Sequence, residues 1–258
     1  MSTNLTLSGS AISTVYLRND VRRVLRNRRA MILTVGMPAL LYLVFGATQS
    51  SKDSIGSGNV AFYVLVGMAL YGAVLAAASN AASVSIEQQS GWTRTLMMTP
   101  LRPAGYVSTK VALALAMSAL PVMVLAVVGV ASGARAGVGT FVVCMLLAWL
   151  GSALFAALGL ALGSVLKSEG AMQALGGVLA LLAFAGNVFV PLNGVMLRIA
   201  EFTPMFGVVS LARYPLDHGV TVYGTSIPLA IIIANVVFWA AAFAVAASYF
   251  YNRSTQRQ

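Results

Sequence analysis

Six long stretches of this 258-residue chain contain no Asp, Glu, Lys or Arg. They cover residues 30–51, 54–86, 111–134, 136–166, 170–197 and 218–252. A helix rises 1.5 Å per residue and satisfies its own backbone hydrogen bonds, so about 20 apolar residues cross the ~30 Å hydrocarbon layer of a bilayer. Every stretch reaches that length. We therefore expect an all-α polytopic membrane protein with six transmembrane helices.

The overall composition points the same way. Hydrophobic residues make up 59% of the chain and charged residues 9%, whereas a soluble domain carries about 25% charged residues. The single cysteine, Cys144, lies in an apolar stretch and has no second cysteine with which to pair. We therefore expect no disulfide within the chain, no metal site and no cofactor bound by this chain.

Removing the polar, Gly and Pro ends of the stretches gives the predicted spans and the domain division. The spans are 30–48, 60–86, 111–131, 138–166, 171–190 and 227–250. Together they form one predicted transmembrane domain over residues 30–252. It is preceded by a segment over residues 1–29 and followed by a short tail over residues 253–258.

The positive charges predict how the chain lies in the membrane, because Lys and Arg in short loops favour the cytoplasmic side. With both termini inside, twelve Lys and Arg are cytoplasmic, and four are outside: Lys52, Arg135, Arg198 and Arg213. We therefore expect both termini in the cytoplasm. The formal net charge of +10 therefore does not indicate a nucleic-acid partner. Membrane orientation and attraction to anionic lipids account for the Arg-rich run over residues 18–29.

The segment before the first predicted span has the pattern of a helix that lies in the membrane surface. Leu17, Val21, Val24 and Leu25 recur at helical spacing between arginines. This helix is either a lever that joins the first span to a cytoplasmic partner or a simple surface anchor. A cleavable signal peptide is not expected, since the basic region is too long and no clear A-x-A site follows.

The predicted spans lack the residues that would let the protein use an energy source alone. Asp, Glu, Lys and His, which bind protons or ions inside carriers and pumps, all fall at span ends or in loops. No catalytic triad, HExxH helix or G-x-x-x-x-G-K-[ST] loop is present. Either the protein is a passive pathway, or a partner supplies the energy, in which case ATP binds another chain.

The longest predicted cytoplasmic loop, over residues 87–110, reads E-Q-Q-S-G-W-T-R-T-L-M-M-T-P-L-R-P-A-G-Y-V-S-T-K. Gly91, Pro100 and Pro103 interrupt helices. Between them only about two helical turns fit, from Trp92 to Thr99, with Trp92, Leu96 and Thr99 along one side. Such a short, partly apolar helix suits docking into a groove on a cytoplasmic subunit.

This loop resembles the coupling helix of the type-2 ABC-transporter permeases, the ABC-2 family, and the resemblance extends over the whole chain. It implies two copies of a separate ABC ATPase, which bind ATP and Mg, and a second permease chain that makes a homodimer or a heterodimer. The residues implied in ATPase docking are Glu87, Gly91, Trp92, Thr93, Arg94, Leu96, Thr99 and Pro100. Trp92 would serve equally well as an interfacial aromatic anchor.

A second segment that carries the resemblance is the predicted outside segment over residues 187–223. Its apolar pieces are too short to cross a membrane and are interrupted by proline, a pattern tolerated at membrane depth only under cover of protein or beside water. The family has short re-entrant helices here that close the outer end of the pathway. The residues implied in this external gate are Pro191, Thr203, Pro204 and Arg213. The alternative is inert packing, with Arg198–Glu201 and Arg213–Asp217 as simple ion pairs.

The resemblance implies the membrane subunit of a bacterial ATP-driven exporter, located in the plasma membrane and surrounded by lipid. A largely apolar path with scattered amides, among them Asn80, Asn187 and Asn235, suits a hydrophobic or amphipathic substrate: a drug, antibiotic, lipid or lipid-linked glycan. The loop sequence is similar to the drug- and antibiotic-export subgroup, which would make the protein a multidrug-efflux component. The alternatives are a passive channel or secondary carrier that acts alone, and a membrane scaffold that moves no substrate.

Overall fold

The computed structural model describes residues 31–48, 54–89, 103–165 and 169–255. Its elements, in chain order, are η1 (Ile32–Gly36), α3 (Met37–Phe45), β1 (Ser54–Ile55), β2 (Gly58–Asn59), α4 (Val60–Gln89), α6 (Pro103–Ala131), α7 (Val138–Val165), α8 (Glu169–Ala185), α9 (Gly194–Ala200), α10 (Pro204–Asp217) and α11 (Leu229–Thr255). The strands β1 and β2 pair as a short antiparallel hairpin. The remainder of these elements is helical, as the sequence predicts.

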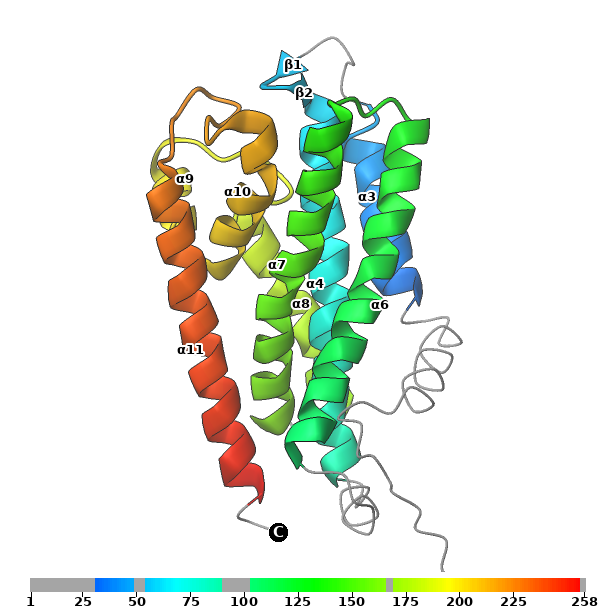
Figure 1. The fold of residues 1–258 in the computed structure, drawn as a ribbon, viewed down its shortest axis with the longest axis vertical. Coiled ribbons are helices and arrows are strands. Elements are labelled where there is room, and N and C mark those ends of the chain that lie inside the picture. Colours follow the sequence, from blue (N-terminus) through cyan, green and yellow to red (C-terminus); the bar gives the residue numbers. More distant parts are fainter. Residues whose placement is uncertain (1–30, 49–53, 90–102, 166–168, 256–258) are drawn as a thin grey trace, which may run out of the picture.

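Helix α4 forms the centre of the bundle, with α7 and α6 beside it in Figure 1. It packs against α3, α6, α7, α8 and α10. Its most apolar window is 94% buried, and the main core cluster contains Phe62, Leu65 and Met68 from this helix. Helices α4 and α7 approach each other closely because small residues face each other at their contact. One such place is where Gly159 of α7 lies against the backbone of Ala78 in α4.

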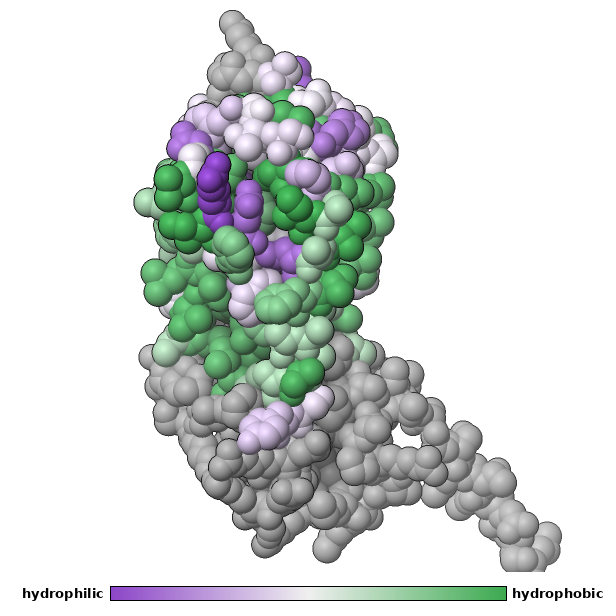
Figure 2. Space-filling model, turned by 90° about the vertical axis from the view of Figure 1, so that its left-hand side faces the viewer, coloured by the Kyte–Doolittle hydropathy of each residue, from purple (hydrophilic) through white to green (hydrophobic). Residues whose placement is uncertain are grey.

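The outside of the bundle is apolar, as a protein surrounded by lipid tails requires. Large hydrophobic side chains are exposed along α3, α6, α7, α8 and α11. On the face that Figure 2 shows, hydrophobic residues predominate over the middle of the molecule, and more hydrophilic residues lie above them at the end that carries β1 and β2. We call that end, with residues 54–59, the hairpin end. The protein is a multi-pass membrane protein.

Four helices among the described residues are long and apolar enough to cross a membrane, over residues 60–83, 112–131, 138–163 and 229–249. The α9–α10 pair passes the same test only as a unit and is bent by 100°. The apolar helices 32–45 and 174–185 are shorter than a full span. The predicted number of six spans therefore stays a prediction.

The boundaries of several predicted spans agree with the helices. The spans 60–86, 138–166 and 227–250 correspond to α4, α7 and α11. Helix α6 begins earlier than the predicted residue 111, at Pro103, because proline is well tolerated in the first helical turn. The domain division stays a prediction. The surface helix with Leu17, Val21, Val24 and Leu25 lies outside the described residues.

The prediction of a helix over 171–190 is wrong at its C-terminal end, because α8 stops at Ala185. Asn187, two residues later, has a φ of 64°, which is left-handed backbone that a helix cannot contain. No charged residue marks this turn in the sequence, and the nearest sign of it is Pro191. The residues from 186 to 193, which we call the link, then lead to α9.

Candidate functional site

The link and the two short helices after it are fixed by local hydrogen bonds. The side-chain oxygen of Asn187 accepts from the backbone N–H of Leu192 at 2.8 Å. Thr203 caps the start of α10 by accepting from the backbone N–H of Phe206 at 3.3 Å, and Pro204 occupies the first turn. Ser, Thr, Asp and Asn caps followed by proline are favourable helix starts. The sharp bend between α9 and α10 is therefore specified by sequence.

Arg213 of α10 is the charged residue that this arrangement encloses, and its side chain is only 2% exposed. Its Nε donates to the carbonyl of Tyr63 at 3.2 Å. Nη1 donates to the carbonyl of Asn187 at 2.7 Å, and Nη2 to that of Val188 at 3.0 Å. The guanidinium also lies over the Tyr63 ring, with Cζ 3.7 Å from the ring centroid. Arg213 thus joins three segments: α10, α4 and the link.

The alternative of a simple Arg213–Asp217 ion pair does not describe this geometry. Carbonyl oxygens accept the hydrogen bonds of the guanidinium, and the Asp217 carboxylate accepts from the backbone N–H of Gly219 at 2.9 Å. Asp217 is the last residue of α10, at the hairpin end.

Helix α11 holds the corner between α9 and α10 from the other side. Asn235 donates from Nδ2 to the carbonyls of Glu201 at 2.6 Å and Thr203 at 3.2 Å. One turn later, Nε1 of Trp239 donates to the carbonyl of Phe202 at 3.1 Å. These carbonyls belong to the corner, where the α9 helix no longer supplies partners. Within the described part of the chain, Oδ1 of Asn235 is buried without a hydrogen-bond partner.

The hairpin end is tied together by Asn59, whose side chain is 4% exposed. Its Oδ1 accepts from the backbone N–H groups of Phe62 at 3.0 Å and Arg135 at 2.9 Å, and its Nδ2 donates to the carbonyl of Gly133 at 2.9 Å. Asn59 therefore caps α4 and at the same time anchors the connection between α6 and α7. The hairpin also reaches α10, because the N–H of Ser57 donates to the carbonyl of Leu216 at 3.0 Å.

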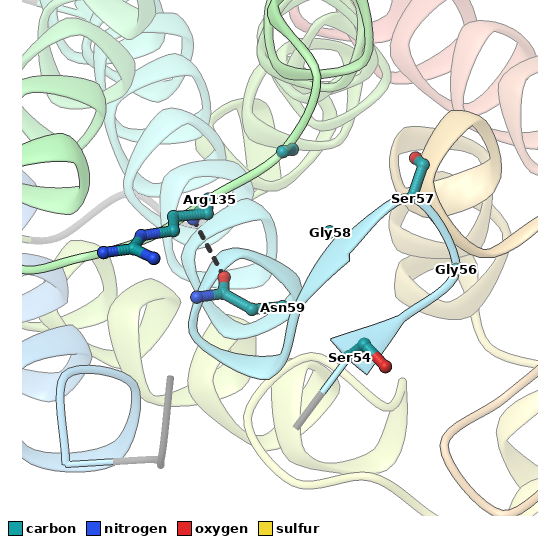
Figure 3. A pocket seen from close by; sticks show the side chains of 7 residues that line it. Ser54, Gly56, Ser57, Gly58, Asn59 and Arg135 are labelled. Atoms are coloured by element: carbon teal, nitrogen blue, oxygen red, sulfur yellow. Dashed lines mark hydrogen bonds between the residues drawn. The ribbon is translucent and has the colours of Figure 1, made fainter. Parts of the chain in front are cut away.

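A hollow of about 470 Å³ lies beside this hairpin. It is lined by Ser54, Gly56, Ser57, Gly58, Asn59, Arg135 and Ala136. Figure 3 shows the bond from Arg135 N to Asn59 Oδ1, with the Arg135 side chain extending away from Ser54 and Ser57. The polar groups that line the hollow do not converge on one point, so it has no built ligand site.

The structure brings together the predicted residues of the second segment. Thr203, Pro204 and Arg213 all belong to α10 or its cap, and Pro191 lies in the link that Arg213 contacts through Asn187 and Val188. Of the predicted docking residues, Glu87 lies in the last turns of α4. The others lie outside the described residues: Gly91, Trp92, Thr93, Arg94, Leu96, Thr99 and Pro100. Their role stays a prediction.

Sequence reasoning missed Asn59, Tyr63 and Trp239. Asn59 had a usable signal, since an asparagine directly before an apolar helix is a typical N-cap. Tyr63 and Trp239 contribute through partners far away in sequence, and nothing local marks them. The predicted amides Asn80, Asn187 and Asn235 all bond backbone groups, which leaves their predicted place along a substrate path untested.

Comparison with known proteins agrees with this architecture. The family model for ABC-2 type transporters matches residues 13–216, a range that extends from before η1 to the last turn of α10. A comparison with curated proteins finds no match. The matched domain is the transmembrane component of a transporter and is not itself catalytic. With four fifths of its length matched, from the first helices through the Arg213 site, the chain belongs to the ABC-2 type transporter family.

Proposed function

We propose that this chain is the membrane subunit of a bacterial ATP-driven exporter. Family membership carries the proposal. The helices 60–83, 112–131, 138–163 and 229–249 support it because they contain no Asp, Glu, Lys, Arg or His, the residues with which carriers and pumps bind protons or ions inside the membrane. The apolar spans favour a hydrophobic or amphipathic substrate, such as a drug, an antibiotic, a lipid or a lipid-linked glycan.

The energy would enter through a separate ABC ATPase, present in two copies with ATP and Mg, which docks on the helix Trp92–Thr99. Helix α4 supports this role because it ends at Gln89, directly before that segment. Its 30 residues form one unbroken helix of about 45 Å. A push at one end of such a helix moves its other end, where Asn59 and the hairpin lie.

The external gate would consist of the link, α9 and α10, as a re-entrant unit around Pro191, Thr203, Pro204 and Arg213. Figure 1 supports the placement, since the C-terminal end of α11 lies opposite the hairpin end. With the termini in the cytoplasm of the bacterial cell, the hairpin end faces outward. Two permease chains, as a homodimer or with a similar chain, would enclose the path, and closure of the ATPases would switch it between two packings.

Co-purification tests the partner. The tagged chain is extracted in mild detergent and the proteins that accompany it are identified. We expect an ATPase with a P-loop motif to accompany the parent chain and to be lost in Leu96→Asp. Val222→Asp is the matched control, since Val222 is an exposed residue beyond the end of α10, and it should keep the ATPase.

Transport by the reconstituted complex tests the activity, with a fluorescent phospholipid analogue and a lipophilic dye as probes. We expect flux only with ATP and Mg. Flux through the chain alone, without nucleotide, would establish a passive carrier and overturn the proposal. An ATPase that binds without any ATP-dependent flux of either probe would favour a scaffold and count against it.

A further inference from the structure

A notch in the most buried helix admits the guanidinium of Arg213. Gly67 lies one turn after Tyr63 in α4, and it has no side chain at the place where the guanidinium passes. A Cβ atom at this position would overlap Nη2 of Arg213 and would lie 2.6 Å from the carbonyl oxygen of Val188. The Arg213 site therefore depends on a glycine of another helix, which lets the backbone of α4, the link and the cation meet.

Three backbone carbonyls accept the hydrogen bonds of the cation in this notch, and the Tyr63 ring lies against the guanidinium. An arginine is charged under all ordinary conditions, and enclosing a charge at membrane depth is unfavourable unless hydrogen bonds compensate. Here the compensation comes from the carbonyls of Tyr63, Asn187 and Val188. The last two lie in the non-helical link, where no helical N–H is available to them. If α4 moves relative to α10, the cation loses the Tyr63 carbonyl and the cage opens.

Once the cage opens, water is the other favourable environment for the guanidinium. The guanidinium is stable in the closed cage and in water, but it is unfavourable in a partly opened arrangement that offers it neither carbonyls nor water. Such a charge favours two distinct conformations, closed and open, and disfavours the intermediate ones. A neutral side chain would lack this property. The same residue therefore both fastens the hairpin end and penalises a partly opened arrangement.

We propose that Arg213 is a positioning residue that latches the outer gate shut, with Gly67 as the notch that receives it and α4 as the element that releases it. The proposal rests on the proposed function, because it assumes that the hairpin end is the outer end of a transport path. It adds how Arg213 holds the gate: the contacts that must break when the gate opens, the glycine that admits the guanidinium, and the helix that links these contacts to the docking segment.

Accessibility of a cysteine at residue 188 tests the latch. Val188 is 1% exposed and lies beside the cage, so Val188→Cys, in a background with Cys144→Ala, reports opening to a membrane-impermeant maleimide added from outside. The complex is assayed in intact cells depleted of ATP. We expect slow labelling in the parent and roughly tenfold or faster labelling with Arg213→Gln, the factor of about one charge-assisted hydrogen bond. Arg213→Lys should be intermediate, because one ammonium cannot reach all the carbonyls.

Gly67→Ala provides the sharper variant, because it displaces the guanidinium without removing the charge. Its matched control is Gly177→Ala in α8, where an added Cβ meets nothing within 4 Å. We expect Gly67→Ala to label like Arg213→Gln and Gly177→Ala to label like the parent. Equal labelling of the two alanine variants in folded protein would overturn the latch.

A second reporter separates opening of the gate from loss of the fold. Ala148 of α7 is fully buried in the core, so Ala148→Cys should stay unlabelled in every latch variant. Labelling of residues 148 and 188 together would mean general loosening and would contradict the latch. The labelling assay needs no nucleotide, so it tests the latch separately from transport. If the labelling results contradict the latch while ATP-driven flux persists, only the latch is rejected and the proposed function is retained. Loss of flux and ATPase binding with selective labelling at 188 would reject only the exporter.

Discussion

Helices α4 and α11 are alike in composition and opposite in environment. Their membrane windows have mean hydropathies of 2.1 and 2.4, yet 94% of the first is buried and only 11% of the second. Each window contains eight alanines. Hydropathy cannot separate the two because lipid tails are as apolar as a protein interior. Glycine does separate them, since Gly67 and Gly72 lie in α4 and none lies in the α11 window.

The largest effect should come from removing a ring from the buried helix. Phe62 of α4 is fully buried and stacks on Phe141 of α7, with ring centroids 4.9 Å apart. Phe62→Ala should lower the free energy of unfolding by about 3 kcal/mol through the cavity it leaves. Phe238→Ala in α11 should have a much smaller effect, because that ring is 64% exposed. Unfolding in mixed micelles, followed by circular dichroism, measures both. Equal losses would contradict the contrast.

Adding volume should sharpen the same contrast. Ala78→Leu places a large side chain where α4 meets Gly159 of α7, and overpacking of this kind costs about 1–3 kcal/mol. Ala240→Leu is the matched change on the exposed side of α11 and should be nearly neutral. The midpoint of thermal unfolding in detergent reports the difference. A neutral Ala78→Leu would mean that the α4–α7 contact is looser than described.

The polar contacts of α11 should give the next effect, since they join this little-buried helix to the α9–α10 corner. Asn235→Ala removes the donor to the carbonyls of Glu201 and Thr203. We expect a loss of about 1 kcal/mol, the size of hydrogen bonds between membrane helices. Asn80→Ala is the control, because Asn80 donates within its own helix, to Ala76. Chemical denaturation that finds Asn80 the more important residue would refute this assignment.

The smallest effect should come from Trp239→Phe. The change removes one hydrogen bond, to the carbonyl of Phe202, and keeps an aromatic ring beside Phe243. A loss of about 0.5 kcal/mol is expected. Because Asn235 and Trp239 hold the same corner, the double variant should show a non-additive loss in a double-mutant cycle. Strict additivity would show that the corner is held at two independent points.

Local patterns account for the parts of the fold that the sequence predicts. The helices α4, α7 and α11 follow from long apolar stretches, and glycine or proline lies shortly before each start, at Gly58, Gly137 and Pro228. Their C-terminal ends agree only approximately, because α4 continues past Glu87 to Gln89 and α11 continues past Arg253 to Thr255. The end of α8 was missed because the left-handed turn at Asn187 lies inside a stretch with no charge to mark it. Pro191, a few residues later, was the remaining signal.

The Arg213 site was only partly predictable for a different reason. The proline pattern around residues 191–215 singled out the segment, and the family resemblance singled out the arginine. Its partners could not be found from the sequence, since the Tyr63 carbonyl lies 150 positions earlier in the chain. Every residue has a backbone carbonyl, so no pattern of residue types in the sequence indicates which carbonyl accepts a hydrogen bond from Arg213.

The position of Asn59 has a consequence for how the protein is made. Its side-chain amide forms hydrogen bonds with the backbone of Gly133 and Arg135, which lie 74 and 76 positions later in the chain. At ordinary rates of synthesis, roughly 4–15 s separate the appearance of the asparagine from that of its partners. Until the connection between α6 and α7 leaves the ribosome, the amide lacks these partners. The hairpin end of α4 therefore gains these contacts late, from a turn that had not yet been translated when α4 was made.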